Sequence, residues 1–209
     1  MRSRPLSNKN PRRDTRRPRG VIRIIGGQWK RTPLSVSDVP GLRPTPDRVR
    51  ETVFNWLMHL FGGSLAGCST LDLFAGTGAL GMEAASRGAE PVVLVERDRA
   101  ALAALRAIAL KLNATQVDVR SDDALSAARK YVAAGTRFSI VFLDPPFGQG
   151  WFPKILPLAS DLCNSTGVIY AECETKLEAS VLAGCKLELV HADKAGDVFY
   201  HLLRRNNNN

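Results

Sequence analysis

Apolar segments of strand length alternate with helical patterns over most of the chain, and this alternation limits the possible folds more than any other feature. Val92–Glu96 is continuously apolar up to its last residue, as expected for a parallel strand that helices cover on both faces. The strand candidates are Thr70–Phe74, Val92–Glu96, Val117–Arg120, Ser139–Leu143, Val168–Glu172, Leu187–His191 and Val198–Leu203. Helical patterns separate the earlier candidates at about 79–87, 99–112, 124–134 and 152–162. The alternation predicts an α/β fold with a doubly wound sheet.

Only the last two strand candidates break the parallel pattern. Their link, Ala192–Asp197, contains Gly196 and is too short to hold a crossover helix. Consecutive strands joined by so short a link pair antiparallel. The sequence therefore predicts a mostly parallel, seven-stranded sheet that ends in a C-terminal antiparallel hairpin.

A smaller β-hairpin is expected ahead of the α/β body. Val21–Ile25 and Trp29–Val36 have the composition of strands, and a Gly-Gly turn lies between them. A helix should then begin at Asp47, its expected N-cap, and continue through about Leu60. These features divide the chain into a basic tail at 1–20, a hairpin extension at 21–46 and a Rossmann-like domain at 47–205.

The positive charge is concentrated at the N-terminal end of the chain. Residues 1–50 hold 14 Lys and Arg against 3 Asp and Glu, whereas residues 51–209 hold 15 against 17. The first 20 residues contain eight of these cations and three prolines, so we expect that segment to be disordered until it meets a partner. A basic front on a neutral body favours a polyanionic partner. A purely solubilising tail would explain the charge alone equally well.

The four cysteines give no indication of a metal site or of disulfide bonds. None of them forms a C-x-x-C pair, so we expect reduced, small apolar residues and no bound metal. No apolar run approaches the ~18 residues that a membrane span needs, and the basic N-terminus lacks the apolar stretch of a secretory signal. These observations predict a cytoplasmic protein with no membrane association, with an Arg-rich transit peptide as the alternative.

A glycine-rich turn follows the first strand of the body. Thr70-Leu-Asp-Leu-Phe-Ala-Gly-Thr-Gly-Ala-Leu-Gly81 runs from strand through turn into helix, and its glycines match G-x-G-x-x-G. Glycines there let the backbone approach a ligand closely at a helix N-terminus. The turn alone fits a dinucleotide or S-adenosylmethionine equally well.

Three acids at the ends of successive strands favour S-adenosylmethionine as the cofactor. Asp72 would repel a pyrophosphate, but it can organise the cationic amino end of a methionine. Glu96 can accept both ribose hydroxyls, and Asp123 can accept the adenine amino group. Each acid taken singly is more simply explained as a helix cap or a surface charge. Together they lie along the edge where open α/β sheets bind ligands.

The segment Asp144-Pro-Pro-Phe147, which follows the fourth strand, indicates the reaction. An exocyclic amine on a nucleic-acid base is a poor nucleophile because its lone pair is delocalised into the ring. The Asp144 carboxylate and the Pro145 carbonyl can accept its two N–H hydrogens, while Pro146 fixes the backbone. Phe147 offers a face for stacking the base, worth roughly 1–3 kcal/mol. The base would have to be unstacked or flipped out.

The D-P-P-F loop together with D-L-F-A-G-T-G-A-L-G resembles the amino-methyltransferases of the Rossmann class. Ile25-Gly-Gly-Gln-Trp-Lys-Arg and Leu42-Arg-Pro-Thr-Pro-Asp-Arg-Val-Arg-Glu51 resemble the bacterial RsmD family more specifically, and the resemblance extends from about Val21 to Arg204. It implies a Rossmann-like, class I S-adenosylmethionine methyltransferase with a small N-terminal β-hairpin. It also implies methylation of N2 of one guanine in 16S rRNA, within the small ribosomal subunit or an assembly intermediate.

The resemblance also implies roles for individual residues. Cofactor positions carry over to Asp72, Phe74, Gly76, Gly78, Glu96, Asp123 and Ala124. Catalytic positions carry over to Asp144, Pro145, Pro146 and Phe147, the last standing where many members have Tyr. Nucleic-acid contacts are expected from Lys30, Arg31, Arg43, Arg48 and Arg50. Thr45 belongs to the same R-P-T-x-x-R-x-R-E segment, and the tail at 1–20 lies outside the shared pattern.

Three other functions fit part of this pattern. A DNA or RNA adenine-N6 methyltransferase uses the same D-P-P-[FY] loop, but the chain has no obvious additional DNA-reading domain. An RNA-binding assembly factor of the same fold could lack catalysis, although the intact Asp144 and Glu96 argue against it. A dehydrogenase is supported by the glycine turn alone. We expect a monomer, because one surface must fit a ribosomal particle.

Overall fold

The computed structural model describes residues 22–35 and 45–206. The basic tail at 1–20, Val21 and the expected RNA contact Arg43 lie outside the described residues. The strands are β1 (Ile22–Arg23), β2 (Pro33–Leu34), β3 (Thr70–Asp72), β4 (Val92–Glu96), β5 (Val117–Ser121), β6 (Phe138–Leu143), β7 (Cys163–Cys173), β8 (Leu187–Ala195) and β9 (Val198–Arg205). The helices are α1 (Asp47–Leu60), α2 (Gly81–Ser86), α3 (Arg99–Lys111), α4 (Ala124–Ala133), α5 (Phe152–Leu162) and α6 (Ala179–Gly184).

The main sheet has seven strands in the order β5-β4-β3-β6-β7-β9-β8. The first five pair in parallel, and β9 runs antiparallel between β7 and β8. Both the doubly wound α/β fold and the C-terminal antiparallel hairpin expected from the sequence are confirmed. Within the described part of the chain, no helix combines the length and apolar character needed to cross a membrane.

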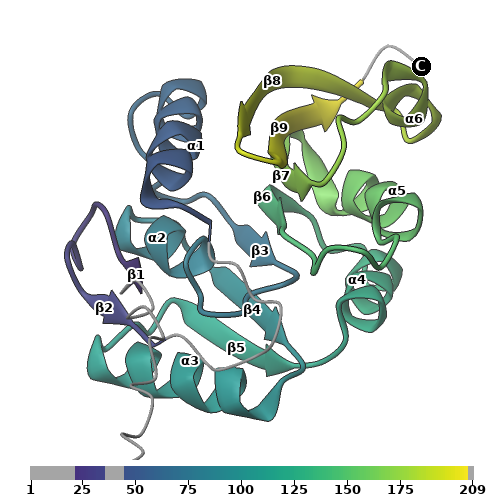
Figure 1. Cartoon of the computed structure of the whole chain (residues 1–209). Coiled ribbons are helices and arrows are strands. Elements are labelled where there is room, and N and C mark those ends of the chain that lie inside the picture. The colour runs from purple at the N-terminus through teal and green to yellow at the C-terminus, as the bar shows by residue number, and fades with distance from the viewer. Residues whose placement is uncertain (1–21, 36–44, 207–209) are drawn as a thin grey trace, which may run out of the picture.

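Helices cover both faces of the main sheet, giving three layers (Figure 1). Because side chains alternate along a strand, neighbouring residues of β4 belong to different cores. Leu94 packs with residues of α1, α2 and α3 on one face. Val95 packs with residues of α4, α5 and α6 on the other. Burial on both faces explains why the central strands are continuously apolar.

Most elements form where the sequence predicted them, but β7 begins five residues earlier, at Cys163. Strand β8 continues to Ala195, so the expected link Ala192–Asp197 is reduced to Gly196 and Asp197.

Two further differences concern helices. Helix α1 begins after Pro46, and the Asp47 carboxylate accepts a hydrogen bond from Arg50 at 2.6 Å instead of capping the helix. Helix α6, a six-residue helix between β7 and β8, was not expected from the sequence.

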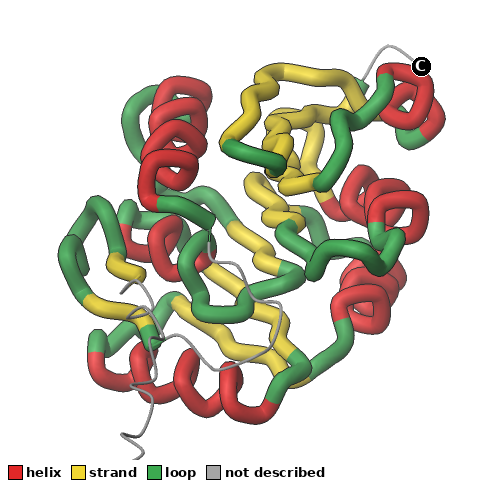
Figure 2. The backbone as a smooth tube through the Cα atoms, viewed as in Figure 1, coloured by secondary structure: helices red, strands yellow, loops and turns green. Residues whose placement is uncertain are grey.

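The N-terminal hairpin is much shorter than expected. Strands β1 and β2 have two residues each and pair antiparallel, and Figure 2 shows that most of the segment joining them is loop. Its backbone is held by side chains of α2, because Glu83 accepts hydrogen bonds from Ile25 N at 2.6 Å and Gly26 N at 2.8 Å. These hydrogen bonds replace those of a strand ladder. The predicted strands over 21–25 and 29–36 were therefore too long.

Candidate active site

The strand order reverses between β3 and β6, because β3 connects onward to β4 on one side while β6 continues to β7 on the other. In open α/β sheets, ligands bind outside the carboxyl ends of the strands at such a switch point. Asp72 is the last residue of β3, and Asp144 directly follows β6. The two acids predicted for cofactor and catalysis therefore lie on neighbouring strands of this edge.

Asp72 connects the end of β3 to the start of α2. Its Oδ1 accepts a hydrogen bond from Phe74 N at 3.3 Å, and its Oδ2 accepts one from Gly81 N at 3.1 Å. The glycine loop turns between these two points, with Gly76 and Gly78 at φ values of 51° and 80°, a conformation that glycine adopts without strain. Burial raises the pKa of Asp72 to about 7, although both backbone hydrogen bonds oppose the shift.

Glu96 joins the end of β4 to the same glycine loop. Its Oε2 accepts a hydrogen bond from Gly76 N at 2.8 Å, and its Oε1 accepts from Arg97 N and Asp98 N, each at 2.8 Å. The carboxylate thus lies beside the turn where the sequence places the cofactor. Its expected contact with ribose hydroxyls stays a prediction.

Asp123 caps the N-terminus of α4, which is the structural role expected of a single acid before a helix. Its Oδ1 caps α4 by accepting hydrogen bonds from Leu125 N at 3.0 Å and Ser126 N at 3.2 Å. Its Oδ2 lies 3.9 Å from a guanidinium nitrogen of Arg97. The expected contact of Asp123 and the buried Ala124 with adenine stays a prediction.

Phe74 contacts an aromatic residue that sequence reasoning missed. Its ring meets Trp151 edge-on, with centroids 5.1 Å apart and planes at 73°. Trp151 precedes α5, only four residues after Phe147. Its buried Nε1 has no hydrogen-bond partner among residues 22–35 and 45–206. The segment that follows β3 is therefore in contact, through these two rings, with the start of α5 just beyond the catalytic loop.

Exposure to solvent increases from the first half of the catalytic loop to the second. Asp144 is half-buried and Pro145 is buried, whereas Pro146 and Phe147 are exposed. An exposed aromatic side chain at the end of a Pro-Pro turn has a free surface for a planar base. Burial raises the pKa of Asp144 well above its usual range, and the charges of Glu172 and Asp72 raise it further.

A second acid beside Asp144 was not recognised as a site residue from the sequence. Glu172, near the end of β7, is 3% exposed. Its Oε1 accepts hydrogen bonds from Thr45 Oγ1 at 2.7 Å and from Tyr170 Oη at 2.8 Å. Thr45 Oγ1 also lies 3.3 Å from Asp144 Oδ2. The signal was present in Val-Ile-Tyr-Ala-Glu172, where one acid ends an apolar strand as Glu96 does.

The expected RNA contacts divide into exposed and buried residues. Lys30, Arg31 and Arg48 are exposed and can reach a phosphate backbone. Arg50 is fully buried, and its guanidinium lies 2.6 Å from Asp47 and 4.0 Å from Glu83. We therefore correct the expectation for Arg50, because a side chain enclosed between α1 and α2 does not meet RNA at the surface.

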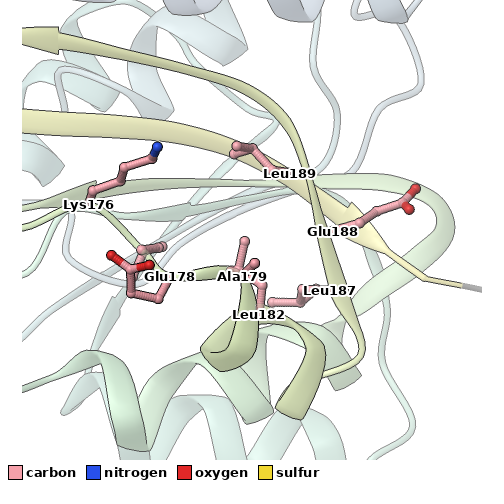
Figure 3. Close-up of a pocket in the computed structure, with 8 residues that line it drawn as sticks. Lys176, Glu178, Ala179, Leu182, Leu187, Glu188 and Leu189 are labelled. Atoms are coloured by element: carbon pink, nitrogen blue, oxygen red, sulfur yellow. The ribbon is translucent and has the colours of Figure 1, made fainter.

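Outside the sheet edge, the described residues contain an apolar cavity but no cluster of metal-binding side chains. In residues 22–35 and 45–206, no three or more His, Cys, Asp or Glu side chains are grouped so that they could hold a metal ion. A cavity of about 340 Å³ lies between α6 and β8, lined mainly by leucines and by Lys176, Glu178 and Glu188 (Figure 3). None of the predicted catalytic or cofactor residues is among the residues lining it.

Comparison with known proteins decides the family. The model of the family described as "Conserved hypothetical protein 95" matches residues 22–204. This chain belongs to that family. The chain is also 43% identical to ribosomal RNA small subunit methyltransferase D of Escherichia coli K12, over 89% of this chain and 91% of the relative. The protein of the same name from Haemophilus influenzae is 42% identical, over 75% of this chain and 80% of the relative.

Solved structures of similar proteins share the fold. A methyltransferase from Escherichia coli superposes with a TM-score of 0.73 at 38% identity, covering 89% of this chain and 98% of that one. A Thermus thermophilus protein superposes with a TM-score of 0.74 at 27% identity, covering 88% of this chain and 99% of that one. A methyltransferase solved in complex with S-adenosylhomocysteine superposes with a TM-score of 0.60 at 16% identity, covering 78% of this chain and 50% of that one, and supports the fold alone.

Proposed function

We propose that this protein transfers a methyl group from S-adenosylmethionine to the exocyclic N2 amine of a specific guanine in 16S rRNA, within the small ribosomal subunit or its assembly intermediate. The observation that carries the proposal is the half-buried Asp144 at the sheet's switch point, followed by a buried proline and an exposed Phe147. The name of the Escherichia coli and Haemophilus relatives supports the choice of rRNA. A ribosomal substrate implies a cytoplasmic enzyme, and we expect it to act as a monomer.

The residues at the carboxyl ends of β3 and β4 fit S-adenosylmethionine. The glycine turn leaves room for a ligand to approach the backbone, and the buried Asp72 fits a cationic amino group better than a phosphate. Glu96 presents carboxylate oxygens beside Gly76 N, where ribose hydroxyls can replace a backbone donor. The bound cofactor would supply an electrophilic methyl group.

The residues of the chain act on the amine that receives the methyl group. Asp144 and the Pro145 carbonyl accept the two N–H hydrogens and orient the nitrogen lone pair toward the methyl donor. Phe147 stacks on the base and holds its plane in position. Holding the reacting atoms at the correct distance and angle is itself a large part of catalysis.

Methylation of defined particles tests the proposal directly. Small subunits from a strain that lacks the mark are incubated with the protein and labelled S-adenosylmethionine, and the modified nucleotide is mapped by mass spectrometry. We expect one N2-methylguanosine in 16S rRNA. A product mapped to N6 of adenine, or no transfer to the particle, would overturn the proposal.

We predict that S-adenosylmethionine binds more tightly as pH rises from 5.5 to 7. The pKa of Asp72 is about 7, so Asp72 is mostly neutral at the lower pH and becomes the anion that a cationic amino group needs. The linkage gives a change of about tenfold in affinity. Calorimetry measures it, with Asp72→Asn expected to flatten the profile and the exposed Asp161→Asn on α5 expected to keep it. An equally steep profile in Asp72→Asn would contradict the assignment.

Deleting residues 1–20 is expected to weaken binding to the particle and to lower its salt dependence. The segment carries eight Lys and Arg, and each phosphate contact releases a counterion. Titration of labelled particle at several salt concentrations measures both effects. A full-length variant with these eight cations replaced by Gln separates charge from chain length. Unchanged affinity and salt slope in both variants would show that the tail makes no contact.

A further inference from the structure

Asp144 does not stand alone at the end of β6, because a second buried acid lies behind it. Glu172 of β7 is 3% exposed, and Thr45, which is 5% exposed, lies between the two acids. The Thr45 hydroxyl is 2.7 Å from Glu172 Oε1 and 3.3 Å from Asp144 Oδ2. These three side chains come from the segment before α1, from the residue that follows β6, and from β7. The fold therefore aligns two carboxyl groups with one hydroxyl between them.

The distances assign a direction to these hydrogen bonds. Thr45 has one hydroxyl hydrogen for two acceptors, Glu172 Oε1 at 2.7 Å and Asp144 Oδ2 at 3.3 Å, and the shorter distance favours donation to Glu172. Tyr170 donates its hydroxyl hydrogen to the same oxygen at 2.8 Å. The Thr45 oxygen keeps its lone pairs, so it can accept a hydrogen from Asp144 Oδ2 when that acid is protonated.

The charges around the two acids favour uptake of a proton. Burial raises the pKa of both Asp144 and Glu172, and the charges of Glu172 and Asp72 raise the pKa of Asp144 further. The hydrogen bonds from Thr45 and Tyr170, and then the Arg50 charge, lower the pKa of Glu172, and the hydrogen bond from Thr45 lowers the pKa of Asp144. Asp144 therefore faces the reacting amine, and Glu172 lies one hydroxyl group behind it as a second carboxyl group that can accept a proton.

We propose that Thr45 and Glu172 form a proton relay behind Asp144, which removes the proton released by methyl transfer. The inference rests on the methyl-transfer function proposed above. Thr45 and Glu172 are positioning residues, because they act only through Asp144.

The step balances in atoms and charge. After methylation the target nitrogen is cationic, and one of its N–H bonds breaks with the electron pair kept on nitrogen. The proton forms an O–H bond on Asp144 and passes from Oδ2 to Thr45 Oγ1, while the original Thr45 hydrogen moves to Glu172 Oε1. The methylated amine becomes neutral, Asp144 returns to the carboxylate and Glu172 becomes the acid. Once the product has left, the proton returns by the same route to water.

Three substitutions test the relay in the full-length protein. Glu172→Gln keeps an oxygen that accepts both hydrogen bonds but cannot store a proton. Thr45→Val removes the hydroxyl at nearly constant shape, and Thr45→Ser restores it. We expect Glu172→Gln and Thr45→Val each to lower kcat about 30-fold with little change in substrate KM, and Thr45→Ser to stay within about threefold of wild type. The double variant should be no slower than either single one, because the residues act as a unit.

The pH dependence adds a readout that a purely structural role would not change. The wild-type rate should rise with pH as the pair ionises, and Glu172→Gln removes a negative charge, so its midpoint should shift to lower pH. Carbon-13 NMR of labelled aspartate follows the same shift at Asp144 without turnover. Thermal melting and S-adenosylmethionine binding check that each variant is folded.

The outcomes separate the relay from the function on which it rests. A wild-type protein that methylates no particle would overturn the proposed function, and the Asp144 titration still decides the relay. A Glu172→Gln variant with an unchanged rate, or with an unchanged Asp144 midpoint, overturns the relay. Additive losses in the double variant also overturn it. If Glu172→Gln does not fold, equal rates for Thr45→Val and Thr45→Ser overturn the relay in its place.

Discussion

Asp144→Asn is expected to lower the single-turnover rate of methyl transfer by about 10³-fold, within the range measured for loss of a group that handles the reacting proton. Asparagine keeps the shape of Asp144, but its amide can neither accept a proton nor match the charge of the methylated amine. S-adenosylmethionine affinity should change by less than about threefold, because Asp72 and Glu96 lie on other strands. The loss should therefore appear in the rate of transfer and not in cofactor binding.

Rapid-quench assays with unmethylated small subunits measure this rate, and calorimetry measures cofactor affinity. Asp161→Asn makes the same chemical change at an exposed position on α5 and should leave both quantities unchanged. A rate for Asp144→Asn within tenfold of wild type would show that the D-P-P-F loop does not handle the amine. An equal loss of cofactor binding would place Asp144 in the cofactor site instead.

Glu83→Ala is expected to lower the free energy of unfolding by about 3–5 kcal/mol, the largest loss of stability among the variants proposed for this protein. Glu83 is fully buried, and its carboxylate accepts hydrogen bonds from Ile25 N, Gly26 N and Arg87 Nε. It also lies 4.0 Å from the buried Arg50 guanidinium. Alanine would remove the negative charge beside the buried Arg50 guanidinium. It would also leave the backbone N–H groups of Ile25 and Gly26 without their hydrogen-bond acceptor. The loop between β1 and β2 should then detach from α2.

Urea titration followed by circular dichroism measures the unfolding free energy. Glu51→Ala, an exposed glutamate on α1, is the matched control and should change it by less than about 0.5 kcal/mol. Hydrogen exchange should increase at Ile25 and Gly26 in Glu83→Ala alone. A loss below about 1 kcal/mol would mean that water replaces the carboxylate at this junction.

Glu83 also shows where sequence reasoning stopped. Gly-Met-Glu-Ala-Ala-Ser is an ordinary short helix, and nothing local distinguishes Glu83 from a surface acid. Its importance comes from groups 57 or 58 residues away in sequence. Arg50 was misplaced for the same reason, because its motif predicts a basic surface while the packing of α1 on α2 encloses it.

The sequence by itself determined the layout of strands and helices, because strand and helix periods are local properties of the chain. Val92–Glu96 and Phe152–Leu162 were predicted at the residues where β4 and α5 form. It also determined the reaction class, since Asp144-Pro-Pro-Phe147 and the glycine turn are continuous motifs. Only the tertiary structure decided which charges are buried and paired. Thr45, Asp144 and Glu172 are up to 127 residues apart, and their alignment follows from the parallel pairing of β6 with β7, which no local pattern encodes.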